Sequence, residues 1–224
     1  MTSTRTRDYG KLTPQQAASC VREKRHDLKE SRRLQGTPGA IVAAARKLFE
    51  SAGVRGTSVA AIAREANVTR ELVYYHFGNR NGVVEAVIDD YVEDLVESVI
   101  VWNEERVFGD TPGSLKKCIR TFRYSLYDKA GNPRPMIRVL EELGIRDAFD
   151  VRATREAADC LSDHIAKQYA AYHQIEIDLV HEMFCVVIFG LVGLVKVKPD
   201  ISDDALMKVV EQTLRLDMVP LPPG

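Results

Sequence analysis

The side chains best suited to chemistry lie close together between positions 69 and 80, in the string T-R-E-L-V-Y-Y-H-F-G-N-R. Val73 and Phe77 are four residues apart, so on a helix they share one face and are expected to be buried partners. The hydroxyl, guanidinium, carboxylate, phenol and imidazole groups around them are left without a core role. Phenol and imidazole groups can donate hydrogen bonds to phosphate oxygens, and a guanidinium can pair with guanine. The string therefore favours contact with a nucleic acid.

Arg70 and Glu71 carry the most specific chemistry in this string. Arg70 could form two hydrogen bonds with O6 and N7 of guanine, which is worth about 1–3 kcal/mol of discrimination between bases. Glu71 could accept from N4 of cytosine, or it could instead hold Arg70 or Arg64 in place. Both roles of Glu71 stay open at this point. The full set of candidate DNA contacts is Thr57, Ser58, Thr69, Arg70, Glu71, Tyr74, Tyr75, His76, Asn79 and Arg80.

Two preceding helices are expected to position this string. The first has one apolar face and ends where Gly53 supplies a helix stop. Thr57 or Ser58 then provides an N-cap oxygen for a second short helix, which a turn at Asn67 closes before a third helix begins at Thr69. A tight turn between two short helices, the second rich in hydrogen-bonding groups, is typical of a helix-turn-helix that reads the major groove. The inward positions of the first two helices are Ile41, Ala44, Ala45, Leu48, Phe49, Val59, Ile62, Ala63 and Ala66.

The string T-S-V-A-A-I-A-R-E-A-N-V-T-R-E-L-V-Y-Y-H-F-G-N-R resembles the DNA-binding signature of the TetR family of transcriptional regulators. Three positions depart from that pattern: Asn67 stands where the family usually has glycine, Gly78 where it often has proline, and Ala60 where it often has a polar residue. Asparagine tolerates the left-handed conformation, so the turn is expected to survive. The resemblance implies an all-α fold, base reading by Thr69, Arg70 and Tyr75, and phosphate contacts from Thr57, Tyr74, His76 and Arg80.

The charge distribution separates an N-terminal arm, residues 1–38, from the rest of the chain. The formal net charge is −1, but the arm holds nine Lys or Arg residues against four acids, which leaves −6 for residues 39–224. Thr13-Pro14-Gln15-Gln16 has the form of a capping box, which predicts a helix from 14 to about 34. This helix is either a solvated basic surface or an accessory phosphate contact. Its positive stripe consists of Arg22, Arg25, Lys29, Arg32 and Arg33.

Helical periodicity continues after the helix-turn-helix, and no segment alternates in the manner of a strand. We expect a DNA-binding domain at 39–88 and a helical body for dimerisation and effector binding at 89–224. The aromatic and sulfur-containing residues of the body are either plain core or the lining of an apolar effector pocket. The candidate pocket residues are Trp102, Phe122, Tyr124, Tyr127, Met136, Phe149, Tyr169 and Phe184.

The last two predicted helices point to a homodimer. Residues 177–196 include the run MFCVVIFGLVGLV, which is apolar on all sides and would be exposed to water unless a partner covered it. The final helix starts at the cap Ser202 and is expected to bury Val209 among its apolar residues. In the resembled family the last two helices of each subunit form the dimer interface. The predicted interface residues are Phe184, Ile188, Leu191, Val192, Val195, Leu206, Val210 and Leu214.

Other classes of function find little support. The sequence contains none of the usual nucleophile, nucleotide or zinc-protease motifs, and its histidines and cysteines are scattered, so we expect neither an enzyme nor a metal or other cofactor. The basic N-terminal segment lacks a signal-like apolar run, and the run 183–195 is short for a membrane span. We expect a cytoplasmic protein without a membrane partner.

Two hypotheses follow for the function. The first is a homodimeric TetR-like repressor that binds a palindromic double-stranded DNA operator and is released by an unknown small, hydrophobic effector. The second keeps the DNA-binding dimer but makes it independent of any effector, with regulation by a protein partner or by abundance.

Overall fold

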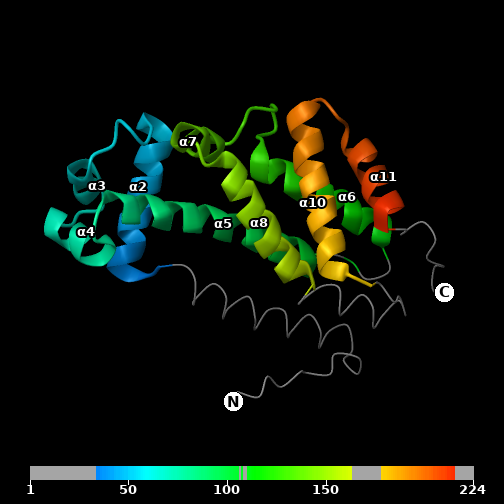
Figure 1. Ribbon diagram of the computed structural model, residues 1–224, viewed down its shortest axis with the longest axis horizontal. Helices are drawn as coiled ribbons and strands as arrows, with labels where there is room; N and C mark the ends of the chain where they lie inside the picture. The colour runs from blue at the N-terminus through cyan, green and yellow to red at the C-terminus, as the bar shows by residue number, and fades with distance from the viewer. Residues whose placement is uncertain (1–33, 106, 108–109, 163–177, 215–224) are drawn as a thin grey trace, which may run out of the picture.

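The computed structural model describes residues 34–105, 107, 110–162 and 178–214 (Figure 1). Within these ranges the chain forms nine α-helices and no β-strand, so the predicted all-α class is confirmed. The basic stripe of the arm and the pocket candidate Tyr169 lie outside the described residues.

Helices α2 (Gly36–Ala52), α3 (Val59–Glu65) and α4 (Arg70–Phe77) form a small three-helix head at one end of the molecule (Figure 1). Their inward faces meet at fully buried apolar side chains such as Ile62. Local capping sets the helix boundaries: Ser58 Oγ accepts from Ala61 N at 3.2 Å, and Thr69 Oγ1 accepts from Leu72 N at 3.3 Å. Asn67 has a φ of 55°, so it adopts the left-handed turn expected from the sequence.

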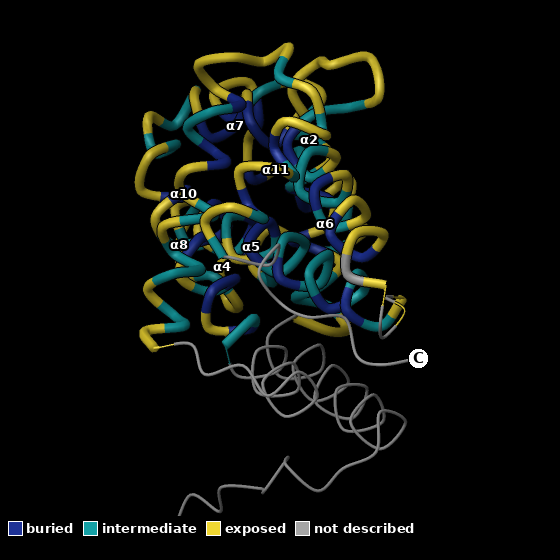
Figure 2. The backbone as a smooth tube through the Cα atoms, turned by 90° about the vertical axis from the view of Figure 1, so that its right-hand side faces the viewer, coloured by how far each residue is buried: buried dark blue, intermediate teal, exposed yellow. Residues whose placement is uncertain are grey.

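Helix α5 (Arg80–Glu105) runs from the head into the body without a break at residue 88 (Figure 1). Asn79 Oδ1 caps its start by accepting from Gly82 N at 3.1 Å. Arg46 of α2 pairs with Asp90 at 2.7 Å and Asp94 at 2.6 Å, which fixes the head against α5. The buried residues of the head and of α5 belong to one apolar cluster that continues into the body, where Figure 2 shows buried segments around α5.

The remaining helices of the body are α6 (Thr111–Leu126), α7 (Pro135–Leu143), α8 (Arg146–Cys160), α10 (Val180–Val197) and α11 (Asp203–Leu214). Helix α8 packs against both α5 and α10, α7 packs against α2 and α8, and α11 packs against α6. The body contains a second, smaller apolar core, in which Leu206 of α11 is fully buried together with Ile119 of α6.

The structure corrects most of the predicted dimer-interface residues. Five of the eight are buried inside a single chain, because α10 and α11 use these side chains to pack on α6 and α8; they are Leu191, Val192, Val195, Leu206 and Val210. Phe184, Ile188 and Leu214 remain half-buried. Conversely, Val209 was expected to be buried but is 40% exposed, and Val186 and Phe189 of α10 are 66% and 41% exposed. The apolar surface open to a partner therefore differs from the predicted one.

The candidate pocket residues do not share one environment. Met136 and Phe149 are buried in the large apolar cluster, whereas Tyr124 is 38% exposed. Phe122 and Tyr127 are half-buried and pack against both apolar cores. Trp102 and Phe184 are also half-buried.

Candidate nucleic-acid interface

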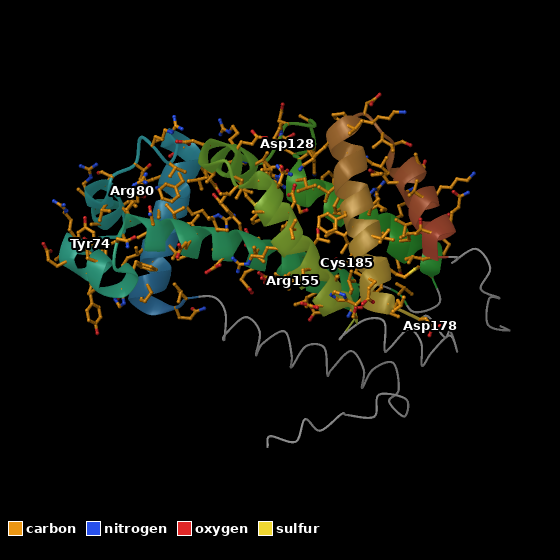
Figure 3. All side chains as sticks on the ribbon, in the orientation of Figure 1. Tyr74, Arg80, Asp128, Arg155, Asp178 and Cys185 are labelled. Carbon is orange, nitrogen blue, oxygen red and sulfur yellow. The ribbon has the colours of Figure 1, made fainter. Side chains whose placement is uncertain are left out.

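Helix α4 exposes five of its eight residues. Val73 is its single buried residue, and Phe77 is only partly buried. Tyr75 is 81% exposed, and its ring meets that of His76 edge to face, with 5.1 Å between the centroids. Tyr74 is 41% exposed at the outer end of the head (Figure 3). The helix is thus anchored along one side, and its polar and aromatic side is open to a partner.

The start of α4 is organised by Thr69 and Glu71. Thr69 caps the helix, and the pKa of the exposed Glu71 is lowered by hydrogen bonds from its own backbone N–H and from the Thr69 hydroxyl, with a smaller contribution from Arg70. The carboxylate thus stabilises the first turn of α4. This arrangement favours the second of the two roles expected for Glu71, in which it holds a neighbouring side chain in place. The side chain that it holds is Thr69, however, and not Arg70 or Arg64.

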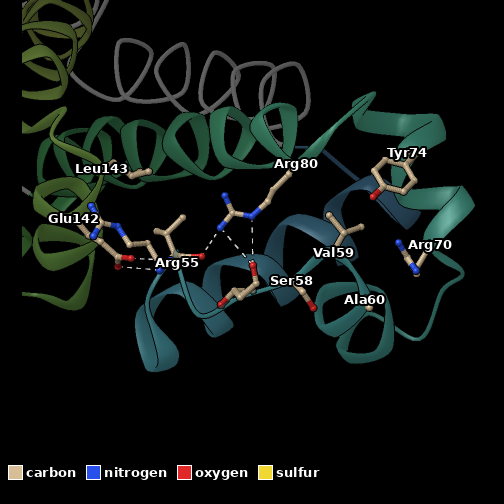
Figure 4. A pocket seen from close by; sticks show the side chains of 11 residues that line it. Arg55, Ser58, Val59, Ala60, Arg70, Tyr74, Arg80, Glu142 and Leu143 are labelled. Atoms are coloured by element: carbon tan, nitrogen blue, oxygen red, sulfur yellow. Dashed lines mark hydrogen bonds between the residues drawn. The ribbon is translucent and has the colours of Figure 1, made fainter.

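A basic depression lies beside α4. Its volume is about 740 Å³, and it is bounded by the loop before α3, by the first turn of α3, by α4 and by the end of α7 (Figure 4). Arg55 and Arg70 contribute exposed guanidinium groups, while Ser58 and Tyr74 contribute hydroxyl groups. Cationic and hydroxyl donors around an open depression are suited to the phosphates of a nucleic-acid backbone. Arg55 is absent from the contacts predicted from sequence. The only sequence feature that indicated it was a basic residue in the loop ahead of the second helix.

Two of the expected phosphate contacts, Arg80 and Thr57, instead form hydrogen bonds with the protein's own backbone. Arg80 donates from its guanidinium to the backbone carbonyls of Val54 and Thr57, with 3.3 Å between Nε and the Thr57 oxygen (Figure 4). Thr57 is only 4% exposed, and its hydroxyl donates to the Gly53 carbonyl at 2.8 Å. The loop between α2 and α3 has carbonyl groups without helical partners, so these two side chains satisfy them.

The remaining candidate residues stay accessible. Ser58 and Asn79 are exposed, although each uses its side-chain oxygen to cap a helix. Arg70, Glu71, Tyr74, Tyr75 and His76 lie on the exposed surface of α4 next to the capping residue Thr69. The structure therefore leaves eight of the ten candidates exposed, and it brings three of them, Ser58, Arg70 and Tyr74, to the same depression.

The head matches a known family over most of its length. Residues 41–87 fit the family described as "Bacterial regulatory proteins, tetR family". These residues therefore form a DNA-binding domain of the TetR type. Its sequence is 41% identical to the HTH-type transcriptional regulator TtgR of Pseudomonas putida over 59 residues, which are 26% of this chain and 28% of that protein. It is 31% identical to the regulator BetI of Burkholderia thailandensis over 68 residues, which are 30% of this chain and 32% of that protein.

The likeness in fold extends beyond the TetR-family head. The TetR family repressor AlkX from a Dietzia strain superposes with a TM-score of 0.55 and 19% identity, covering 84% of this chain and 98% of that one. A TetR-family regulator from Streptomyces coelicolor gives 0.52 and 20%, covering 83% and 100%. At these identities the likeness shows the fold alone. The sequence relatives TtgR and BetI are matched over less than a third of their length.

Proposed function

We propose that this chain is a DNA-binding transcriptional regulator of the TetR type, acting as a homodimeric repressor in the cytoplasm. The observation that carries the proposal is α4: a helix with one buried residue, an exposed Tyr-Tyr-His run and Arg70, held in a TetR-family head. In this arrangement α4 enters the major groove, where Arg70 and Tyr75 reach base edges. Arg55, Ser58, Tyr74 and His76 lie on the flanks and contact phosphates.

The apolar surface of α10 supports dimerisation. Val186 and Phe189 are exposed, and a Cβ added at Gly190 or Gly193 would meet nothing within 4 Å in the same chain. The glycines are therefore not required by packing within one chain, and they leave room for the close approach of another helix. Two heads held by such an interface would meet a palindromic operator one helical turn apart, roughly 34–36 Å, or a multiple of that distance.

Helix α10 is also long and apolar enough to cross a membrane, judged by length and composition. Its contacts support a protein partner instead. Leu191 and Val195 are part of the second core, and Lys196 at the end of α10 forms an ion pair with the buried Asp150 of α8. A helix anchored along one side in this way has only its outer side left to cover.

We place the effector site beside Phe122 and Tyr127, because these rings lie where the two apolar cores of the body meet. A hydrophobic molecule bound there would change DNA affinity only if it bound two conformations of the body with different affinities.

The alternative is a regulator without an effector, controlled by a protein partner or by abundance. Thermal-shift screening separates the two, since a ligand at 100 times its Kd adds about 2.7 kcal/mol of stability. A lack of response across broad metabolite sets would favour the alternative.

Gel-shift assays of the full chain with fragments of genomic DNA test the function itself. We expect a subset of fragments to be retained at about 150 mM salt, where non-specific binding is weak. A variant in which Arg70 and Tyr75 are both replaced by alanine should lose this selection. If every fragment is bound equally by the wild type, or none is bound, the proposal fails.

A further inference from the structure

The loop that joins α2 to α3, residues 53–58, is held by the body of the protein. Glu142, next to the last residue of α7, accepts from the backbone N–H groups of Val54 at 2.8 Å and Arg55 at 2.7 Å. These contacts join residues 88 and 87 positions apart in the chain. Neither N–H lies within a helix, so Glu142 satisfies donors that would otherwise need water.

The opposite side of the same loop is held by Arg80, whose guanidinium donates to the carbonyls of Val54 and Thr57 (Figure 4). The peptide groups around Val54 are thus held by a carboxylate from α7 and a guanidinium from α5. We call this arrangement of Glu142, Arg80 and residues 53–58 the loop clasp. The N–H groups of Arg55 and Val54, together with the charges of Arg55 and Arg80, hold the pKa of Glu142 below its usual range, so the carboxylate is ionised at neutral pH.

Gly53 also lies close to Glu142 of α7. Its φ of 79° favours glycine, and an added Cβ would lie 2.9 Å from Glu142 Oε2. A second side chain of α7, Arg138, donates to the Glu50 carbonyl near the end of α2 at 3.3 Å. Two side chains of α7 therefore contact the backbone that leads into α3.

We infer that Glu142 is a positioning residue through which α7 sets the geometry of the DNA-contacting loop. The loop carries Arg55 and ends at Ser58, both of which border the basic depression beside α4. Helix α7 is itself embedded in the body, where Met136 and Leu140 are buried. A shift of α7 in the body moves the acceptor for Val54 and Arg55, and with it the phosphate-contacting side of the head. The inference rests on the proposed DNA-binding function and names the residue that links body and head.

The consequence for binding follows from the ordering of the loop. With the clasp intact, the loop is fixed before DNA arrives, so binding does not have to restrain it. Without Glu142, two backbone donors are released to water and the loop gains freedom. DNA affinity should then fall by roughly tenfold, while the packing of the helices is unchanged.

Hydrogen exchange of the full chain tests the clasp directly. In Glu142→Ala the amides of Val54 and Arg55 should exchange at least about tenfold faster than in the wild type. The amide of Gly53 should keep its rate, because it donates to the Phe49 carbonyl. The matched control is Glu141→Ala, which removes the neighbouring exposed carboxylate of the same helix. Glu142→Gln should fall between the two, since one amide oxygen replaces two carboxylate oxygens as acceptors.

DNA affinity measured on the same variants completes the test. Faster loop exchange together with a roughly tenfold loss of affinity in Glu142→Ala, and neither change in Glu141→Ala, supports the inference. Unchanged exchange at Val54 and Arg55 overturns the clasp, whether or not the protein binds DNA. Faster exchange with unchanged DNA affinity overturns the positioning role. A wild type with normal loop protection and no DNA binding overturns the proposed function instead.

Discussion

Helices α4 and α10 both bury few of their residues, but the groups that they expose differ in kind. Helix α4 buries Val73 and presents phenol, imidazole and guanidinium groups. Helix α10 buries three residues and presents valine, phenylalanine and glycine. Water satisfies the first surface and not the second. Exposure therefore indicates two kinds of partner, a polar and charged one at α4 and an apolar one at α10.

The largest expected effect comes from placing charge on the apolar surface. Replacing Val186 and Phe189 together by glutamate should raise the Kd of the dimer by about a hundredfold or more, because buried unpaired carboxylates are costly to desolvate. DNA affinity should fall with it, since a single head makes about half of the phosphate contacts. Sedimentation velocity and gel shifts measure the two effects. The control is Gln212→Glu on the exposed side of α11. A dimer that persists in the double variant would show that another surface is used.

The polar surface of α4 is tested by Arg70→Ala. We expect a loss of about 1–3 kcal/mol in discrimination at one base position, with a smaller change in affinity for unrelated DNA. Competition assays with operator variants measure this. Arg155→Ala removes the same charge from α8 in the body and should leave both quantities unchanged (Figure 3). A uniform loss of affinity in Arg70→Ala would assign this residue to phosphate contact.

Within the head, Arg80 and Arg55 are expected to have different roles, since Arg80 supports the loop and Arg55 contacts phosphate. Arg80→Ala should lower the free energy of unfolding by about 1–3 kcal/mol, because two loop carbonyls lose a charged donor. Arg55→Ala should change that free energy by less than about 0.5 kcal/mol but reduce the salt slope of DNA binding by about one. Urea unfolding and salt titrations measure the pair. The reverse pattern would restore Arg80 as a phosphate contact.

The smallest expected effect concerns the N-terminal arm, whose role as an accessory phosphate contact remains a prediction. Deleting residues 1–33 should weaken DNA binding by about threefold at 50 mM salt and by less at 200 mM, because only a few charges are lost and salt screens them. Binding isotherms at the two salt concentrations provide the measurement. Identical isotherms at 50 mM salt would make the arm a solvated surface.

The head could be predicted from sequence because its determinants are local. Helical periodicity, an N-cap at Thr57 or Ser58 and the left-handed Asn67 each act within a few residues. The structure confirms the helices and the conformation of Asn67, and of the two candidate caps Ser58 is the one that accepts the hydrogen bond. The inward positions of Thr57 and Arg80 could not be predicted in this way. They follow from backbone carbonyl groups in the loop after α2 that accept hydrogen bonds from these side chains, which the residue types alone do not reveal.

The body shows the same limit more strongly. The sequence identified the apolar character of α10 and α11, but not which apolar residues face their own chain. Leu206 and Val210 were assigned to a partner and instead pack on α6, since periodicity marks an apolar face without naming what covers it. Glu142 gave no signal at all, because its partners are backbone N–H groups nearly ninety residues away.

The most direct test of the central claim is to sequence the genomic DNA fragments that the full chain retains at about 150 mM salt. A dimer with two α4 helices predicts an enriched inverted repeat whose half-sites are one helical turn, or a multiple of one turn, apart. The Arg70→Ala, Tyr75→Ala double variant should fail to enrich that repeat. Fragments without a shared sequence, or the same enrichment by the variant, would contradict the assignment of α4 as the DNA-reading helix.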